Sequence, residues 1–241
     1  MSLKKIFGFI VFSLLTYNVS LGQEYIITSS LHLNNRGSGL GFGVREKNKK
    51  KVNSVYEFHV MNLKSFKELT ISNVGMANSS QEPGTFKYGK INQVLQFRFG
   101  YGKEVSLAKR PDKNAIGIIW NSTAGLNLAF QIPVFIDYNT PGQNENGFIT
   151  VRYDPEVHER PNIIQSHSYY NGLSGSKFIP SLFLKQGLIM EFGNYANSPS
   201  RLESGLILDA FPIQPQIMYN QKLPHFFLSF YVSFALLNFE I

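Results

Sequence analysis

The sequence predicts an all-β fold, an antiparallel transmembrane β-barrel of about eight strands with a filled polar lumen and two long extracellular loops. The clearest sign is the stretch 224–241, in which apolar residues alternate with mostly small or hydroxylated ones. A membrane-spanning strand needs about 9–11 tilted residues with this alternation. No segment after residue 22 is long and apolar enough for a transmembrane helix. A closed barrel is the other structure that pairs every backbone group inside a membrane.

The N-terminus predicts export. Lys4 and Lys5 precede an apolar run over 6–15, and small residues stand at the two positions that a signal peptidase reads. We therefore expect residues 1–22 to be a signal peptide and residues 23–241 to form one outer-membrane β-barrel domain. The alternative, a retained single-span anchor, would need about 20 apolar residues.

The composition limits the chemistry of the chain. There is no cysteine, which removes disulfides, thiolate nucleophiles and cysteine-based metal sites. The formal net charge of +7 is mildly basic and suits outer-membrane lipid and lipopolysaccharide, whose headgroups carry phosphates. No run of like charge is long enough to indicate nucleic acid, so no nucleic-acid partner is expected.

The first three expected strands are short. Residues 25–33 alternate apolar residues with Thr, Ser and His, residues 39–45 alternate glycine with Leu, Phe and Val, and residues 55–61 alternate aromatic residues or Val with Glu, His and Met. Turn-forming residues over 34–38 predict a tight connection between the first two. The three alternate glycines predict that a bulky lumenal side chain on a neighbouring strand needs the space opposite them.

Four further strands precede the last one. Residues 94–107 set Phe and Tyr against Arg, Gln, Glu and Gly, and residues 115–130 set Ile, Trp and Leu against Asn, Thr and Gly. Residues 182–192 and 202–211 alternate apolar residues with a face that includes Lys, Glu and Asp. Each segment thus offers one face to lipid and one to the interior of a barrel.

The connections between these strands predict which end of the barrel faces outward. Bacterial barrels alternate short periplasmic turns with longer external loops. The connections 46–52, 108–114 and 195–200 are short, whereas 62–90 and 131–179 on the opposite side are long. The chain is therefore expected to be integral to a bacterial outer membrane, with both termini in the periplasm.

The strand count has an alternative. Residues 68–74 and 86–90 would raise it from eight to ten if they formed a membrane hairpin and not a loop. Residues 131–179 contain many Pro, Gly and Asn residues, so they are expected to form one large loop. Within it, 148–153 is expected to pair as a short extension above the membrane.

The lumenal face of the expected strands carries charges of both signs. Eight strands enclose an interior just wide enough for side chains to fill. Opposite charges there should pair, because an unpaired buried charge costs several kcal/mol. We expect a structural network, with a proton or ion path, and thus a small pore, as the alternative. Its members are His32, Arg45, Glu57, His59, Arg98, Glu104, Lys185, Glu191, Glu203 and Asp209.

One polar cluster in the large loop contains the residue types of a hydrolase. Outer-membrane barrels resembling lipid A deacylases use a Ser and a His near the outer rim. A hydrolase needs a nucleophile, a base and an orienting acid within mutual hydrogen-bond reach. No nucleophile motif surrounds the serines here, so a non-enzymatic role is favoured over a hydrolase, which stays open as the alternative. Two histidines do not make a metal site, and no metal or cofactor is expected. The candidates are Asp154, His158, Glu159, Ser166, His167 and Ser168.

The same loop is rich in aromatic residues. Binding energy at protein interfaces concentrates in a few aromatic and Arg anchors. The loop is therefore expected to bind a second outer-membrane protein. The expected anchors are Phe135, Tyr138, Arg152, Tyr153, Tyr169 and Tyr170, with Phe148 beside them.

Several segments resemble an outer-membrane β-barrel family of Bacteroidota. They are 36–45, 87–90 together with 97–104, 112–114, and 209–212, and the likeness extends over nearly the whole mature chain. The resemblance implies an envelope role without known enzymatic activity, as an accessory subunit beside an outer-membrane assembly machine. The expected function is thus that of a non-enzymatic structural or accessory binding subunit. A lipid A-modifying hydrolase at the outer rim and a small pore are the alternatives.

Overall fold

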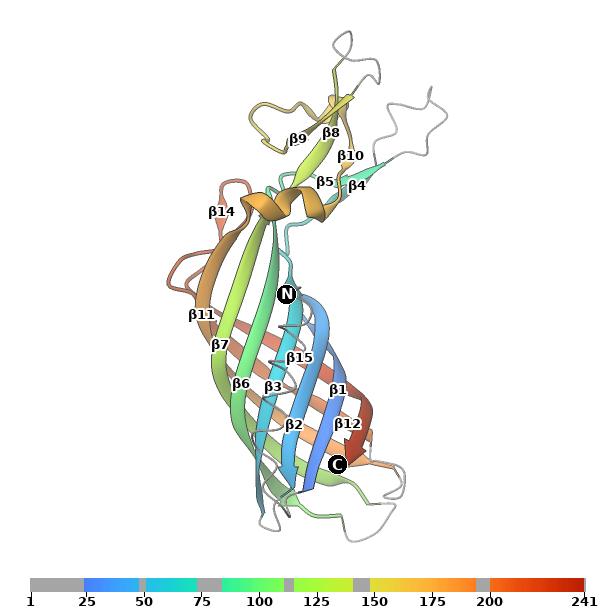
Figure 1. The fold of residues 1–241 in the computed structure, drawn as a ribbon, viewed down its shortest axis with the longest axis vertical. Helices are drawn as coiled ribbons and strands as arrows, with labels where there is room; N and C mark the ends of the chain where they lie inside the picture. Colours follow the sequence, from blue (N-terminus) through green and yellow to red (C-terminus); the bar gives the residue numbers. More distant parts are fainter. Residues whose placement is uncertain are drawn as a thin grey trace, which may run out of the picture.

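A closed antiparallel barrel of eight strands dominates the computed structural model, which describes residues 24–47, 51–72, 84–110, 115–140, 148–193 and 200–240 (Figure 1). Each barrel strand pairs with the next one along the chain, and the last closes on the first. The predicted fold class is confirmed, whereas the expected signal peptide lies outside the described residues. The barrel strands are β1 (Glu24–Asn34), β2 (Gly37–Lys47), β3 (Val52–Leu63), β6 (Asn92–Ala108), β7 (Gly117–Pro133), β11 (Lys177–Phe192), β12 (Ser200–Ala210) and β15 (Phe226–Glu240).

The two faces of the barrel wall follow the predicted alternation. On the outer face large apolar side chains are exposed, among them Phe42 of β2, Leu126 of β7 and Leu206 of β12. The residues between them point inward and are buried, including Arg98 and Lys185. A period of two along every strand therefore separates an oily exterior from a polar interior.

Two of the three alternate glycines of β2, Gly39 and Gly41, make room for lumenal side chains, as predicted, whereas no described side chain lies close to Gly43. A methyl group added at Gly41 would lie 2.5 Å from Nε2 of His32, on the neighbouring strand β1. One added at Gly39 would lie 2.8 Å from Cγ of Met61 on β3. Any larger residue at these positions would displace a buried side chain.

The barrel wall is taller on one side than the sequence predicted. β6 and β7 each have 17 residues and β11 has 16, whereas β1 and β2 have 11 each. β7 continues past the expected end at 130 and β11 begins before 182. The long strands rise above the short β1–β2 hairpin (Figure 1).

The two long loops contain small sheets of their own. β4 (Thr70–Ser72) pairs with β5 (Thr85–Lys87), and β8 (Phe135–Asn139) pairs with both β9 (Phe148–Arg152) and β10 (Ile163–Ser166). The ten-strand alternative is wrong, because β4 and β5 form a separate two-stranded sheet outside the barrel. The pairing expected over 148–153 is confirmed.

A hydrophobic core joins these two loops into one unit. Phe86 from the first loop is buried against Ile136, Tyr153 and Ile163 from the second. The expectation of one large irregular loop over 131–179 was therefore incomplete. We call the unit the cap; its described residues are 64–72, 84–91, 134–140 and 148–176.

Two short 3-10 helices complete the second loop, and a hairpin completes the third. The helices are η2 (Arg160–Asn162) and η3 (Tyr169–Gly175), and the hairpin pairs β13 (Gln216–Met218) with β14 (Gln221–Lys222). η3 packs against β7, where Gly172 lies close to Pro133. Within the described residues, no helix is long and apolar enough to span a membrane.

Candidate functional site

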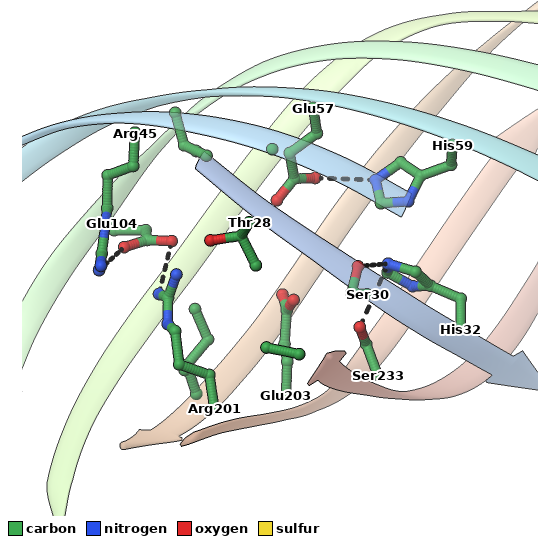
Figure 2. Close-up of a pocket in the computed structure, with 14 residues that line it drawn as sticks. Thr28, Ser30, His32, Arg45, Glu57, His59, Glu104, Arg201, Glu203 and Ser233 are labelled. Atoms are coloured by element: carbon green, nitrogen blue, oxygen red, sulfur yellow. Dashed lines mark hydrogen bonds and ion pairs between the residues drawn. The ribbon is translucent and has the colours of Figure 1, made fainter. Parts of the chain in front are cut away.

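The lumen holds three groups of ion pairs, and the first lies near the end where β2 and β6 finish. Glu104 accepts from Arg45 at 2.9 Å and from Arg201 at 2.8 Å (Figure 2). Glu191 lies 3.3 Å from Arg45. Four strands thus contribute to one cluster in which cations and carboxylates alternate.

The second group lies at mid-height. Lys185 contacts Glu57 at 2.7 Å and Glu203 at 3.2 Å. The hydroxyl of Tyr231 donates to Glu203 at 2.7 Å, and His59 lies 3.1 Å from Glu57. The fully buried lysine is therefore held by two carboxylates, as a buried ammonium requires.

The third group is a single isolated pair. Nη2 of Arg98 donates to both carboxylate oxygens of Asp209, at 3.0 and 2.8 Å, and Asn127 donates to the same carboxylate at 3.2 Å. Both charges are almost completely buried. The pair links β6 to β12 across the lumen.

An apolar plug closes the lumen at the cap end. It combines lumenal residues of the long strands with residues from the connection between β12 and β15. Its members are Leu63, Val94, Ala129, Ile179, Phe211, Ile217, Met218, Leu223 and Phe227. The plug and the ion pairs together fill most of the described part of the barrel.

A small cavity of about 50 Å³ remains between the first and second groups (Figure 2). His32 and His59 border it, with their ring centroids 4.3 Å apart in an edge-to-face arrangement. His32 is held by the hydroxyls of Ser30 at 3.0 Å and Ser233 at 3.2 Å. The volume has room for a few water molecules and no larger ligand.

All ten residues expected in the lumenal network point into the barrel and take part in it. The sequence reasoning missed Arg201, because the expected strand began at 202. Extending the alternation back from Glu203 by two residues would have placed it inward. Among the described residues no group of His, Cys, Asp or Glu has the geometry to hold a metal ion.

Protein reconstituted into planar lipid bilayers is expected to show no steady ion conductance. The apolar plug and the paired charges leave ions no solvated path through the described lumen. A porin with a wide aqueous lumen, measured in the same bilayers, is the positive control. Reproducible single-channel steps from this protein would contradict the filled interior.

The candidate catalytic residues fall into two separate places in the cap. In the first, Nδ1 of His158 bonds the backbone of Asp154 at 3.0 Å, and its ring packs on Tyr138 with centroids 4.9 Å apart. Glu159 is exposed at the start of η2. This cluster is a structured turn.

In the second place a histidine is oriented by an acid. Nδ1 of His167 lies 3.0 Å from Asp137, which also accepts from Thr150 at 2.8 Å and from Gln165 at 3.0 Å. Burial raises the pKa of Asp137, but these hydrogen bonds outweigh burial, and its pKa is below the ordinary value. Within the described chain, neither Ser166 nor the adjacent serine hydrogen-bonds the His167 ring.

A pocket of about 300 Å³ opens beside His167, and we call it the rim pocket. Lys87 and Lys90 line it from β5 and the turn after it, and Ser168 and Tyr169 line it from the start of η3. Sequence reasoning did not find it because its walls come from both long loops. The signal available was a pair of lysines separated by a turn.

One carboxylate serves both lysines of the rim pocket. Glu68 lies 2.7 Å from Nζ of Lys87 and 3.0 Å from Nζ of Lys90. Burial lowers the pKa of Lys90, and although Glu68 raises it, the result is about 8. The pocket therefore holds more positive than negative charge along this wall.

The expected partner-binding residues differ in exposure. Tyr169 is 61% exposed and Tyr170 81%, and Arg152 is also exposed. Phe135 and Tyr138 are half-buried. These positions stay predictions as partner contacts.

Tyr153 is the exception among them. Its ring is 3% exposed within the core of the cap, and its hydroxyl accepts a hydrogen bond from the amide of Gly89 at 3.2 Å. The expectation that Tyr153 is an anchor was wrong, because this side chain joins the two loops and has no surface to offer a partner.

Comparison with solved structures finds similar chains from Neisseria and Yersinia. Neisserial surface protein A is 7% identical with a TM-score of 0.42, covering 91% of this chain and 96% of that one. The attachment invasion locus protein of Yersinia pestis is 11% identical with a TM-score of 0.35, covering 90% and 97%. Its complex with the heparin analogue sucrose octasulfate is 10% identical, with the same TM-score and coverage.

No family model and no curated protein matches the chain. The fold assignment rests on the strand pairing described above. The resemblance to a Bacteroidota family stays a prediction.

Proposed function

We propose that the protein is an integral outer-membrane barrel whose cap docks a second outer-membrane protein, so that it serves as a structural or accessory binding subunit of a complex. The observation that carries this is the cap itself, in which two long loops share one hydrophobic core. A loop that merely connects strands has no need of such a core. In this arrangement the cap is extracellular and both termini are periplasmic.

The outer face of the barrel supports the membrane location. Large apolar side chains are exposed on every barrel strand, including Leu33, Phe42, Tyr56, Phe99 and Leu126. A water-soluble protein rarely exposes an apolar surface that encircles it. The closed strand pairing leaves no backbone edge unpaired in lipid.

The filled lumen and the isolated His167 favour docking over the alternatives. A pore needs a solvated path, and the described lumen contains paired charges and an apolar plug. A hydrolase needs a nucleophile that is hydrogen-bonded to its general base. Among the described residues, no hydroxyl hydrogen-bonds the ring of His167, which Asp137 orients. Docking needs a rigid surface with aromatic anchors, which η3 provides with Tyr169 and Tyr170.

Replacing Tyr169 and Tyr170 together with alanine is expected to reduce recovery of a cross-linked outer-membrane partner by about tenfold or more. Both rings are mostly exposed on a helix anchored to β7, so their loss removes contact area without touching the cap core. The measurement is cross-linking in intact cells followed by mass spectrometry. Val157→Ala, another exposed apolar side chain of the cap, is the matched control.

A second pair of variants separates docking from lipid chemistry. His167→Ala and Ser168→Ala are expected to leave the lipid A mass spectrum of the cell unchanged, because no nucleophile stands on the His167 ring among the described residues. Disappearance of a lipid A species in the His167→Ala strain would contradict docking and favour the hydrolase.

A further inference from the structure

We propose that the rim pocket binds the phosphate group of an anionic lipid of the outer leaflet, whose acyl chains lie along the outer wall of β6 and β7. The inference rests on the outer-membrane placement proposed above, and it assigns a ligand to the rim pocket, which shares Tyr169 with the proposed docking surface on η3. Three features carry it: the cations of the pocket, its further hydrogen-bonding groups, and the apolar wall below it.

The cations come from two lysines that share one counter-charge. Glu68 balances one ammonium, and the second stays uncompensated beside it, since Lys87 and Lys90 bond the same carboxylate oxygen. A phosphate, with its three acceptor oxygens and negative charge, complements such a pair. Lys87 is partly exposed, so its ammonium group can be reached from solvent.

Further groups line the pocket from the second loop. Asp137 occupies Nδ1 of His167, which leaves Nε2 as the second polar atom of a ring that borders the pocket. The exposed Ser168 offers a hydroxyl donor. Thr150 and Gln165 also hold Asp137, so the histidine ring is fixed in place. The pocket thus offers donors from both loops around one volume of about 300 Å³.

The pocket stands above an apolar strip of the barrel wall. Gln93 lines the pocket on β6 and pairs with Ile132 of β7, and both side chains are buried, so the strip begins with the next pair along the wall. Successive pairs on the same outer face are Leu95 with Phe130, Phe97 with Leu128, and Phe99 with Leu126. The Phe97 and Phe130 rings touch with centroids 5.4 Å apart, and the Phe130 and Phe178 rings with centroids 5.3 Å apart.

This arrangement matches a lipid and not a free anion. A soluble phosphate would use the lysines alone, whereas a lipid also covers the aromatic strip that leads away from the pocket. Alternation along the strands is what places the strip there, because Gln93 and Phe97 share the outer face. The ligand class is therefore a phosphate-bearing lipid.

The affinity of the rim pocket for the lipid phosphate is expected to depend on pH. Lys90 faces Glu68 and Lys87 from the first loop, while Asp137, His167 and Tyr169 belong to the second. Burial lowers the pKa of Lys90 to about 8, so its ammonium is lost as the pH rises through that value. Binding should weaken there, since one of the two cations disappears.

The test is native mass spectrometry of the whole protein released from maltoside micelles. The probes are dihexanoyl phosphatidic acid, dihexanoylglycerol, which has the same chains without phosphate, and inorganic phosphate. Phosphatidic acid is expected to bind about tenfold or more tightly than either of the other probes. The pH arm repeats the measurement about one unit below and one unit above the pKa of Lys90.

Two variants locate the site. Lys87→Gln, and Lys87→Gln combined with Lys90→Gln, should each weaken phosphatidic acid binding, the double variant by about tenfold or more. Lys222→Gln, an exposed lysine on β14 away from the pocket lining, should leave it unchanged. SDS gel electrophoresis checks that each variant is folded, because a folded barrel migrates differently before and after boiling.

Equal binding of dihexanoylglycerol, equal binding of inorganic phosphate, or unchanged binding in both lysine variants would each overturn the inference. None of these results touches the docking proposal, which the Tyr169 and Tyr170 cross-linking experiment tests on the wild-type lysines. Conversely, loss of the cross-linked partner leaves the lipid measurement on purified protein intact.

Discussion

Asp209→Ala is expected to destabilise the barrel by about 3–5 kcal/mol, the largest effect of any single change considered for this chain. Asp209 has no exposed surface, and Arg98 is 2% exposed. The guanidinium of Arg98 lies 2.8 Å from the Asp209 carboxylate. Removing that carboxylate leaves the buried guanidinium without its counter-charge. Asn127 would lose its acceptor as well.

The measurement is reversible unfolding by urea in phospholipid vesicles, followed by the gel mobility of folded and unfolded protein. Arg98→Met combined with Asp209→Leu is the matched control, because a well-packed apolar pair often replaces a buried ion pair at little cost. The double variant should recover most of the lost free energy of unfolding. A double variant as unstable as the sum of its singles would show that the two charges do not act as a pair.

Leu126→Arg is expected to cost about 2–4 kcal/mol, the range for Arg on the lipid face near the bilayer midplane. Leu126 is 56% exposed halfway along β7, and its neighbours Phe99 and Leu182 on the adjacent strands are also exposed. An arginine there must leave water for hydrocarbon.

Val157→Arg provides the comparison. Val157 is 68% exposed in the cap, which lies in water if the cap is extracellular as proposed. Surface substitutions of this kind usually change the free energy of unfolding by about 0.5 kcal/mol or less. Both variants are measured by the same urea titration. Equal costs at the two positions would mean that Leu126 does not face lipid.

The barrel was readable from the sequence because its signal is local. In β15 the alternation is visible residue by residue: Leu228 and Phe230 are exposed, while Ser229 and Tyr231 are buried. The lumenal network could be predicted from the same alternation, because every second residue of a barrel strand faces the lumen. Arg201 was missed only because the end of a strand is harder to locate than its middle.

The cap was not readable, because its contacts join distant segments. Phe86 meets Ile136 and Ile163, and all three lie on strands of three to five residues. Such short strands carry too few residues for a period to show. Asp137 and His167 are 30 positions apart in the sequence, so no short motif predicts their contact.

The difference in height between the two sides of the barrel gives the molecule a direction in the plane of the membrane. The cap rises beside β6, β7 and β11, while β1 and β2 are joined by a tight turn (Figure 1). A neighbouring membrane protein that approaches β1 and β2 contacts only the outer face of the barrel. One that approaches β7 can also contact η3 of the cap. Under the docking proposal lateral encounters are therefore unequal, and we expect the neighbour to dock on the side of β7 and η3.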